Sequence, residues 1–291
     1  MVSFFRRLLQ MKRIGHGGTL DPGASGVLPI LVGKATRLSD YLMDYEKTYV
    51  AELTLGLATS TQDASGETTA LNTEFTVSPQ RLADVLASFQ GTIWQTPPMV
   101  SAVRVGGRRL YELAREGVSV PRKPRQVQIH AINIMAIWHE QETLGFGTRV
   151  LLRVVCSKGT YIRTLCHDIG EKLGVGAHMS FLTRVKSGPL HSSQAYTLEE
   201  ITELVERGSL EFLLPMQHAL PDWVQVKVHP LVEERIKNGH FILPEHLVDV
   251  PSTLTVGDDV VLLSLDGQML ALAEIRKTDR LICQPFRVFM E

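Results

Sequence analysis

The segment from Gly15 to Pro29 constrains this chain more than any other, because it combines a single carboxylate with five glycines. It reads GHGGTLDPGASGVLP, and the carboxylate is Asp21. Glycine is entropically costly to order, so glycines gathered in one loop indicate unusual dihedral angles or close backbone approaches. Pro22 disfavours helical angles at Asp21. The segment therefore predicts a fixed acid presented on a loop, followed by a buried strand over residues 27–32.

Other interpretations of this segment are judged by its spacing. A Gly, Asp and Pro cluster before a strand is also typical of a plain turn, in which the aspartate closes a local hydrogen bond. A phosphate-binding loop is excluded, because Gly33-Lys34 is followed by Ala35 where Ser or Thr is needed. A dinucleotide fingerprint is excluded because Leu20 stands where its third glycine belongs. On composition alone, a plain turn and a catalytic loop both stay open.

Three more sequence blocks follow the glycine-rich segment. They read KTYV at 47–50 with TQDASG at 61–66, PPMVSAVR at 97–104 with LYELAR at 110–115, and SKGTYIR at 157–163 with GAH at 176–178. In this order, the four blocks resemble the motifs of the TruB family of tRNA pseudouridine synthases over about residues 12–220. Four ordered motifs of this length make the resemblance specific.

The resemblance implies an α+β fold over residues 1–222, in which helices flank a mixed, largely antiparallel sheet. Beyond residue 222, apolar residues alternate as in strands at 226–228, 260–265 and 269–275, and Asp266-Gly267 is a strong two-residue hairpin signal. A small all-β domain is therefore predicted over residues 223–291. The resemblance implies that this domain is a PUA-like RNA-binding domain, although its residues are also consistent with a packing module.

Hydrophobic periodicity predicts the remaining elements. Helices are expected over residues 3–13, 35–43, 79–91, 161–173 and 198–207. Strands are expected over residues 49–57, 127–138 and 149–156. Ser78 and Pro79 are typical of a helix start, as N-cap and first helical residue.

Charge is balanced overall but unevenly distributed. The 291 residues carry 30 Lys and Arg against 31 Asp and Glu, which argues against indiscriminate binding of polyanions. Residues 102–125 hold seven basic residues and two glutamates, and residues 1–15 hold four basic residues and no acid. These basic patches favour a protein that grips one folded nucleic acid in one place.

Composition also bounds the compartment and the cofactors. No apolar run approaches the ~20 residues that a membrane helix needs, and Arg6 and Arg7 interrupt the short apolar stretch at the start. We therefore expect neither a membrane anchor nor a secretory signal, and a cytoplasmic protein. The three cysteines form no Cys-x-x-Cys pair and the ten histidines no His-x3-His pair, so no metal site is predicted.

The resemblance implies that the protein isomerises uridine 55 in the T loop of tRNA to pseudouridine without a cofactor. The reaction breaks the bond from ribose C1′ to uracil N1, turns the base and rejoins it through C5. The resemblance makes Asp21 the nucleophile, and its attack on C1′ or on C6 stays open. It makes Arg163 the cation that keeps Asp21 ionised, and Tyr49 the ring that stacks on the uracil. With an ordinary pKa of about 10, Tyr49 is a poor base at neutral pH unless it is assisted.

Further residues are candidates for contact with the RNA. Tyr161 and Leu182 match positions that line the uridine pocket, and His16 matches a histidine that fills the space left by the uridine as it swings out. Each of these three is also an ordinary core or loop residue by type. Contacts to phosphates, which position an RNA without specifying its sequence, are expected from Arg104, Arg108 and Arg109. The expected partner is the T stem-loop of tRNA, bound by a monomer.

The chain departs from the family pattern at Val100, where an aromatic residue is common, and at Arg104, where lysine is common. It also begins after the strand and the Lys-Pro-x-Gly motif with which family members usually open. We therefore expect Met1 to be an internal methionine of a protein that begins about 20–30 residues upstream.

Two rival functions are considered. One is a catalytically impaired chaperone of tRNA folding from the same family, against which the intact Asp21, Tyr49 and Arg163 argue. The other is a hydrolase of glycosidic bonds, which needs a second acid as proton donor. Neither Asp63 nor Asp168 has a sequence context that announces such an acid.

Overall fold

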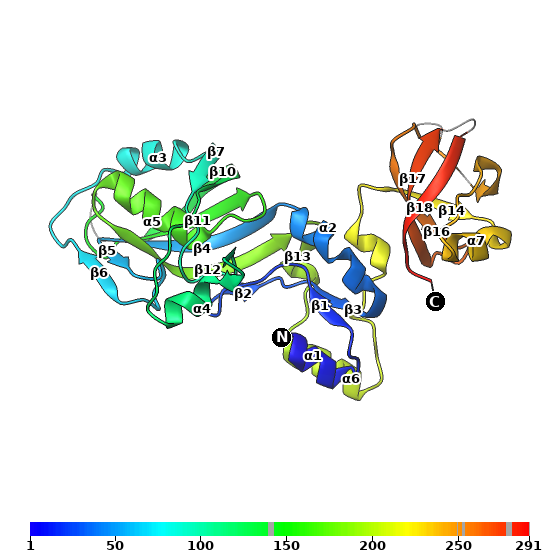
Figure 1. The fold of residues 1–291 in the computed structure, drawn as a ribbon. Coiled ribbons are helices and arrows are strands. Elements are labelled where there is room, and N and C mark those ends of the chain that lie inside the picture. The colour runs from blue at the N-terminus through cyan, green and yellow to red at the C-terminus, as the bar shows by residue number, and fades with distance from the viewer. Residues whose placement is uncertain (139–142, 249, 252–253, 278–280, 291) are drawn as a thin grey trace. The chain divides into compact units, whose positions relative to one another are not determined.

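The computed structural model describes residues 1–138, 143–248, 250–251, 254–277 and 281–290 (Figure 1). The chain divides into two compact units. The first, called here the sheet unit, consists of His16–Pro29 and Leu42–Ala195. The second consists of Met1–Gly15, Ile30–Tyr41 and Tyr196–Glu291. Among the described residues, no helix is both long and apolar enough to cross a membrane.

The sheet unit is built on a seven-stranded sheet in the order β13-β12-β4-β11-β10-β7, with β2 also paired to β12 (Figure 1). Its strands are β2 (Ser25–Gly26), β4 (Lys47–Leu55), β7 (Gly91–Gln95), β10 (Arg125–Trp138), β11 (Arg149–Cys156), β12 (Ala177–Ser187) and β13 (Leu190–His191). The pair of β2 and β12 is parallel and the other pairs are antiparallel. The predicted α+β fold with a largely antiparallel sheet is confirmed.

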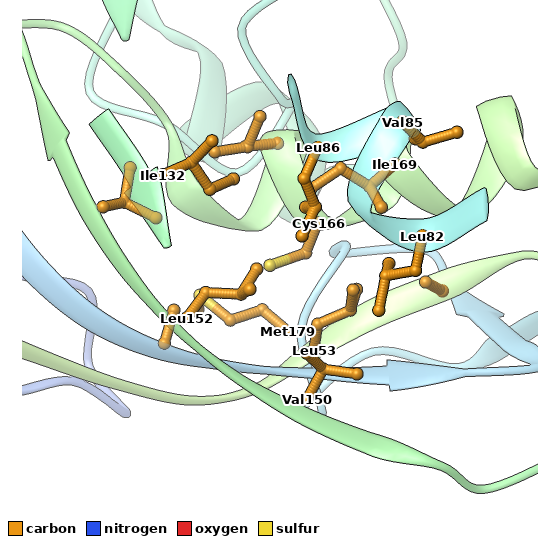
Figure 2. Close-up of a cluster of buried hydrophobic side chains, with 14 of the residues drawn as sticks. Leu53, Leu82, Val85, Leu86, Ile132, Val150, Leu152, Cys166, Ile169 and Met179 are labelled. Atoms are coloured by element: carbon orange, nitrogen blue, oxygen red, sulfur yellow. The ribbon is translucent and has the colours of Figure 1, made fainter. Parts of the chain in front are cut away.

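One face of this sheet is covered by helices α3 (Pro79–Ala87) and α5 (Ile162–Leu173). In β4, Ala51, Leu53 and Leu55 are fully buried on that face and alternate with more exposed residues, as the two-residue period of a strand requires. Figure 2 labels side chains of this core: Leu53, Leu82, Val85, Leu86, Ile132, Val150, Leu152, Cys166, Ile169 and Met179. The predicted cap is present, because the Ser78 side chain accepts a hydrogen bond from the backbone N–H of Arg81 at 3.1 Å.

Strand β12 contains two irregularities in its pairing with β4, and the first of them changes which of its side chains face this core. Met179 lies opposite Leu53, and the register shifts by one residue immediately after it. Beyond the shift, Arg184 lies opposite Tyr49, on the same face as the buried residues of β4.

Smaller elements connect the main strands. They are the pairs β5 (Leu57–Thr59) with β6 (Thr68–Leu71) and β8 (Arg104–Val105) with β9 (Arg108–Arg109), and the helices α2 (Ser39–Asp44) and α4 (Leu110–Arg115).

The second unit contains a small helical core and a five-stranded sheet. In the helical core, α1 (Val2–Leu8) and α6 (Leu198–Glu206) bury Phe5 and Ile201 against the paired strands β1 (Ile14–His16) and β3 (Ile30–Val32). The sheet has the order β15-β14-β16-β17-β18. Its strands are β14 (Val224–Val228), β15 (Leu247–Val248), β16 (Asp259–Leu263), β17 (Met269–Lys277) and β18 (Leu281–Val288), with the short helix α7 (Glu233–Lys237) packed against β17 and β18.

Four predicted elements differ clearly from the observed ones. The helix predicted over residues 79–91 ends at Ala87, and Gly91 begins β7. The first helix ends at Leu8 rather than near residue 13, and Gln10 has a positive φ of 50°. The strand predicted over residues 27–32 is reduced to β3, because the backbone N–H of Val27 donates to the Arg184 carbonyl of β12 instead. The helix predicted over residues 35–43 is a 3-10 helix, η1 (Gly33–Leu38), continued by α2.

The hairpin predicted at Asp266-Gly267 is present between β16 and β17, but its loop has three residues. The backbone N–H of Ser264 donates to the Gln268 carbonyl at 2.9 Å, so the ladder continues to that pair. Gly267 has a φ of 86°, the left-handed conformation that three-residue hairpin loops require. The domain boundary after residue 222 stays a prediction.

Candidate active site

Asp21 occupies the first position of a β-turn that precedes β2. The backbone N–H of Ala24 donates to the Asp21 carbonyl at 2.9 Å, and Pro22 takes the second position, which its fixed φ suits. The backbone of Asp21 therefore closes the turn while its carboxylate remains available for other contacts. The two interpretations of this segment, a plain turn and a loop that presents an acid, therefore both describe the observed loop.

Two glycines of this loop have a clear conformational reason. Gly18 and Gly26 have φ values of 128° and 98°, which disfavour any residue with a Cβ. A Cβ at Gly26 would also overlap the carbonyl group of Arg184. Gly23 has neither a positive φ nor a close neighbour, so the general expectation for these glycines is wrong at that position.

The loop presents Asp21 to Arg163, which lies in the first turn of α5. Nη2 of Arg163 is 3.0 Å from Oδ1 of Asp21 and donates to the carbonyl of Val100 at 2.8 Å. The Arg163 side chain is only 4% exposed, against 31% for Asp21. Two residues that are 142 positions apart in sequence thus form a half-buried ion pair.

A second carboxylate, Asp63, approaches the other side of the same guanidinium. Its Oδ2 is 3.8 Å from Nη1 of Arg163. Its Oδ1 accepts hydrogen bonds from the Thr61 hydroxyl at 2.7 Å and the Ser65 N–H at 2.9 Å. From the sequence, Asp63 was considered as a second acid, and its neighbouring residues gave no sign of that role. The TQDASG block does indicate a fixed carboxylate, because hydroxyl residues two positions before and after an aspartate form local hydrogen bonds with its side chain.

The two carboxylates differ in their electrostatic surroundings. Burial raises the pKa of Asp21 above its ordinary range; Arg163 lowers it, and the negative charge of Asp63 raises it further. Burial also acts upward on the pKa of Asp63, but the hydrogen bonds of Ser65 and Thr61 and the charge of Arg163 bring it below its usual range. Arg163 thus favours the ionised form of Asp21, as expected, yet desolvation outweighs that effect. A less solvated carboxylate is also a better nucleophile.

Tyr49 projects from β4 on the face that carries Arg184. Burial raises the pKa of its phenol and the charge of Arg184 lowers it, with a smaller upward effect of Asp21. The negative charge of Asp21 therefore influences the pKa of Tyr49.

Lys47, the first residue of the KTYV block, anchors the start of β4. Its ammonium donates to the carbonyls of Leu42, Met43 and Tyr45 at 3.2, 2.5 and 2.6 Å, and burial lowers its pKa to about 8. These bonds cap the end of α2 and fix the strand two residues before Tyr49. The lysine of this motif therefore has a structural role that sequence reasoning did not assign.

The other predicted pocket residues occupy different settings. Nδ1 of His16 accepts a hydrogen bond from the Gly18 N–H at 3.4 Å, so the histidine lies at the base of the Asp21 loop. The Tyr161 ring lies 5.8 Å from the Arg163 guanidinium. Leu182 is 6% exposed and belongs to the hydrophobic core of the sheet unit. Their contacts with a uridine stay predictions.

Arg104, Arg108 and Arg109 lie together on the exposed hairpin of β8 and β9, where Arg104 is the cross-strand partner of Arg109. Arg108 pairs with Glu116, and Arg109 donates to the Tyr111 hydroxyl at 2.9 Å. The structure thus brings the three arginines together, and no hydrogen bond or ion pair joins them to the Asp21 loop among the described residues.

Within the described ranges, no three His, Cys, Asp or Glu side chains are grouped so that they could hold a metal ion. The three cysteines are unpaired and buried.

The match to known families covers most of the chain. Residues 6–162 match the TruB family pseudouridylate synthase (N terminal domain), and residues 163–221 match the tRNA pseudouridylate synthase B C-terminal domain. The junction between the two matches falls at the start of α5, beside Arg163.

Individual relatives agree. The tRNA pseudouridine synthase B of Moorella thermoacetica is 46% identical over 280 residues, which cover 96% of this chain and 90% of that protein. The one of Geobacillus thermodenitrificans is 40% identical over 291 residues, which cover 99% and 94%.

Among solved structures, a chain of an H/ACA RNP bound to a substrate RNA containing 2′-deoxyuridine is similar, with a TM-score of 0.72 and 27% identity. That match covers 100% of this chain and 80% of the other. A chain of a Cbf5-Nop10-Gar1 complex matches with a TM-score of 0.71 and 29% identity, over 99% of this chain and 80% of that one. From the family matches and the identities to its relatives, this chain belongs to the TruB family of pseudouridylate synthases and is a pseudouridine synthase, an isomerase.

Proposed function

We propose that this protein converts uridine 55 in the T loop of tRNA to pseudouridine, with Asp21 as the nucleophile. The observation that supports the proposal most directly is the contact of Asp21 with the buried Arg163. Both residues lie in sequence motifs typical of the family. The names of the relatives, tRNA pseudouridine synthase B, support tRNA as the substrate.

The reaction is an isomerisation that needs no co-reactant. The Asp21 carboxylate attacks C1′ of the ribose or C6 of the ring, and the bond from C1′ to N1 breaks. The freed uracil turns, a bond from C1′ to C5 forms, and the bond from Asp21 to C1′ or C6 breaks, which restores the carboxylate. The C5 proton leaves and N1 gains a proton. Arg163 holds the carboxylate in one orientation before the attack. Its Nε is buried and has no hydrogen-bond partner among the described residues.

The substrate uridine must leave its stack to reach Asp21. Enzymes that act on a base extrude it, and a tRNA loop presents partly unstacked bases at low energetic cost. In this proposal, His16 fills the space that the base leaves and Tyr49 stacks on the extruded base. Tyr161 and Leu182 line the pocket that receives it. The arginine hairpin of β8 and β9 would contact phosphates. It is exposed and basic, which suits a contact that positions the RNA.

The proposal extends to the organisation of the protein. We propose that residues 223–291 form a PUA-like RNA-binding domain, that the protein acts as a monomer, and that it meets tRNA in the cytoplasm. Light scattering of the purified complex should give one protein per tRNA, and a 2:2 complex would overturn the monomer.

Pseudouridine mapping tests the proposed activity directly. An unmodified tRNA transcript incubated with the protein should gain pseudouridine at position 55 and nowhere else in the T arm. A transcript with cytidine at that position is the matched control and should gain none. Modification of another uridine, with position 55 unchanged, would refute the assigned substrate.

Asp63→Asn should lower the single-turnover rate by about tenfold near neutral pH, because Arg163 loses one of the two carboxylates that orient it. The acid limb of the pH–rate profile should also move to lower pH. The negative charge of Asp63 raises the pKa of Asp21, so its removal keeps Asp21 ionised further into acid. Glu67→Gln, which changes a nearby exposed carboxylate, should alter neither. An acid limb that moves to higher pH would contradict this coupling.

Activity is expected to survive exhaustive treatment with EDTA. The assigned roles use a carboxylate, a guanidinium and an aromatic ring, none of which needs a Lewis acid. Rates are compared on prefolded tRNA, since tRNA folding itself depends on Mg²⁺. Loss of activity that Zn²⁺ restores and Mg²⁺ does not would show a metal requirement.

A further inference from the structure

Arg184 of β12 is a buried arginine that sequence reasoning did not single out. It is 1% exposed and ranks among the largest fully buried side chains of the protein. Its Nε donates to the Val27 carbonyl at 2.7 Å, Nη2 to the Gly18 carbonyl at 3.1 Å and Nη1 to the Thr19 carbonyl at 3.3 Å. Gly18 and Thr19 precede Asp21, and Val27 follows it. One side chain therefore ties both ends of the Asp21 loop together.

The backbone of Arg184 holds the same loop. Its carbonyl accepts a hydrogen bond from the Val27 N–H at 2.8 Å, in the parallel pairing of β2 with β12. Gly26 lies so close to this carbonyl that a Cβ there would overlap it. Small displacements of Arg184 would therefore move the backbone that carries Asp21.

Arg184 also lies beside the second predicted catalytic side chain. It is the direct cross-strand partner of Tyr49, and such partners have Cβ atoms about 4.5–5.5 Å apart. The charge and the side chain of Arg184 lower the pKa of the Tyr49 phenol, against the larger upward effect of burial. Tyr49 needs assistance to act as a base, and Arg184 is the cation placed to supply it.

A purely structural role explains this arrangement poorly. A buried charge costs several kcal/mol unless it is well paired, and apolar residues often fill such sites at lower cost. Arg184 has no carboxylate within ion-pair distance in the part of the chain that the structure describes. It also lies near a second cation, because its charge lowers the pKa of Lys47. A site that only had to be packed would not need two cations here.

We propose that Arg184 is a positioning residue of the isomerisation, which holds the Asp21 loop and the Tyr49 hydroxyl in one fixed geometry. This inference rests on the proposed function, because it assigns Arg184 to the reaction of Asp21 and Tyr49. Arg163 orients the carboxylate itself, whereas Arg184 acts through the loop backbone and the phenol. The two arginines therefore act on different degrees of freedom of one site.

Arg184→Lys and Arg184→Met test the proposal. Lysine keeps the buried charge but cannot reach carbonyls on both sides of the loop at once, and methionine keeps the volume without charge. Both should lower the single-turnover rate on tRNA by about 100-fold, the cost of a displacement of about 1 Å in a catalytic group. Affinity for tRNA should stay within about threefold of the parent, because it is distributed over many phosphate contacts. Arg153→Lys and Arg153→Met, at an exposed arginine of β11, should change neither quantity.

A second readout is independent of activity. The protein labelled with 3-fluorotyrosine should give one ¹⁹F resonance for each of its six tyrosines, and the resonance lost in Tyr49→Phe assigns Tyr49. In Arg184→Met this resonance should shift and titrate at higher pH, while it stays unchanged in Arg153→Met. An arginine that only held the loop backbone would leave the titration of Tyr49 unchanged, so the shift separates the action on the phenol from the action on the loop.

The outcomes separate this inference from the proposed function. If the parent makes no pseudouridine at position 55, the proposed function fails, whatever the ¹⁹F spectra show. If the parent is active and Arg184→Lys keeps its rate within about threefold, the positioning role is overturned. It is also overturned if Tyr49 titrates as in the parent in Arg184→Met. If neither variant folds at any assay temperature, as judged by thermal melting, Arg184 belongs to the fold and not to the reaction.

Discussion

Asp21→Asn is expected to abolish pseudouridine formation, with a loss of more than about 1,000-fold in the single-turnover rate. The amide has the shape of the carboxylate and its oxygen can still accept the hydrogen bond of Arg163. It is, however, a far weaker nucleophile than a carboxylate. The side chain is 31% exposed and its backbone closes a turn, so the fold should not depend on its charge.

Binding and chemistry must be measured separately for this variant. Affinity for tRNA should stay within a few-fold of the parent, because phosphate contacts distributed over the protein supply most of it. Asp84→Asn, at an exposed aspartate of α3, is the matched control and should retain the parent rate. If Asp21→Asn still turns over at about a tenth of the parent rate or more, the nucleophile is another group.

Arg163→Lys should lower turnover by about 100-fold or more, although it keeps a positive charge. The guanidinium reaches Asp21 and the Val100 carbonyl through Nη2 and lies beside Asp63 through Nη1. A single ammonium cannot occupy both positions. The carboxylate would keep its counter-charge but lose its fixed orientation, so the rate should fall while the affinity for tRNA does not.

Thermal melting and an exposed control complete this test. Arg81→Lys, at an exposed position of α3, should match the parent in rate and melting temperature. Arg163→Lys should remain folded at the assay temperature, since the buried charge is retained beside two carboxylates. Kinetics close to those of the parent would reduce Arg163 to a structural residue of α5.

The sequence predicted the elements whose evidence is local. Alternation in β4, β10 and β11, the cap at Ser78, and the helical spacing of α5 are all contained within a few residues of each element. The motifs of the family gave Asp21, Tyr49 and Arg163, and the structure places the first and third in contact. These features need no knowledge of what packs against them.

The site also contains residues that no local pattern reveals. Asp63 matters because it lies beside a guanidinium 100 positions away. Arg184 occurs in the string Thr-Arg-Val-Lys, which is typical of an alternating strand with solvent-exposed charges, and yet it is fully buried. The expected effect of Arg163 on Asp21 was correct in sign, but burial outweighs it, and burial is a property of the folded state.

The register shift that follows Met179 in β12 constrains which sequence changes this protein can accept. Side chains on a strand alternate between faces, so the shift decides that Arg184 points toward Tyr49 rather than to the opposite side of the sheet. Chain length between Met179 and Arg184 is therefore as strictly constrained as residue identity. Deleting one residue between Met179 and Arg184 would leave every family motif recognisable in the sequence. It would still place the Arg184 side chain on the face of the sheet opposite the Asp21 loop. Substitutions elsewhere in this stretch keep the face on which Arg184 lies, whereas the insertion or deletion of one residue is expected to reverse it.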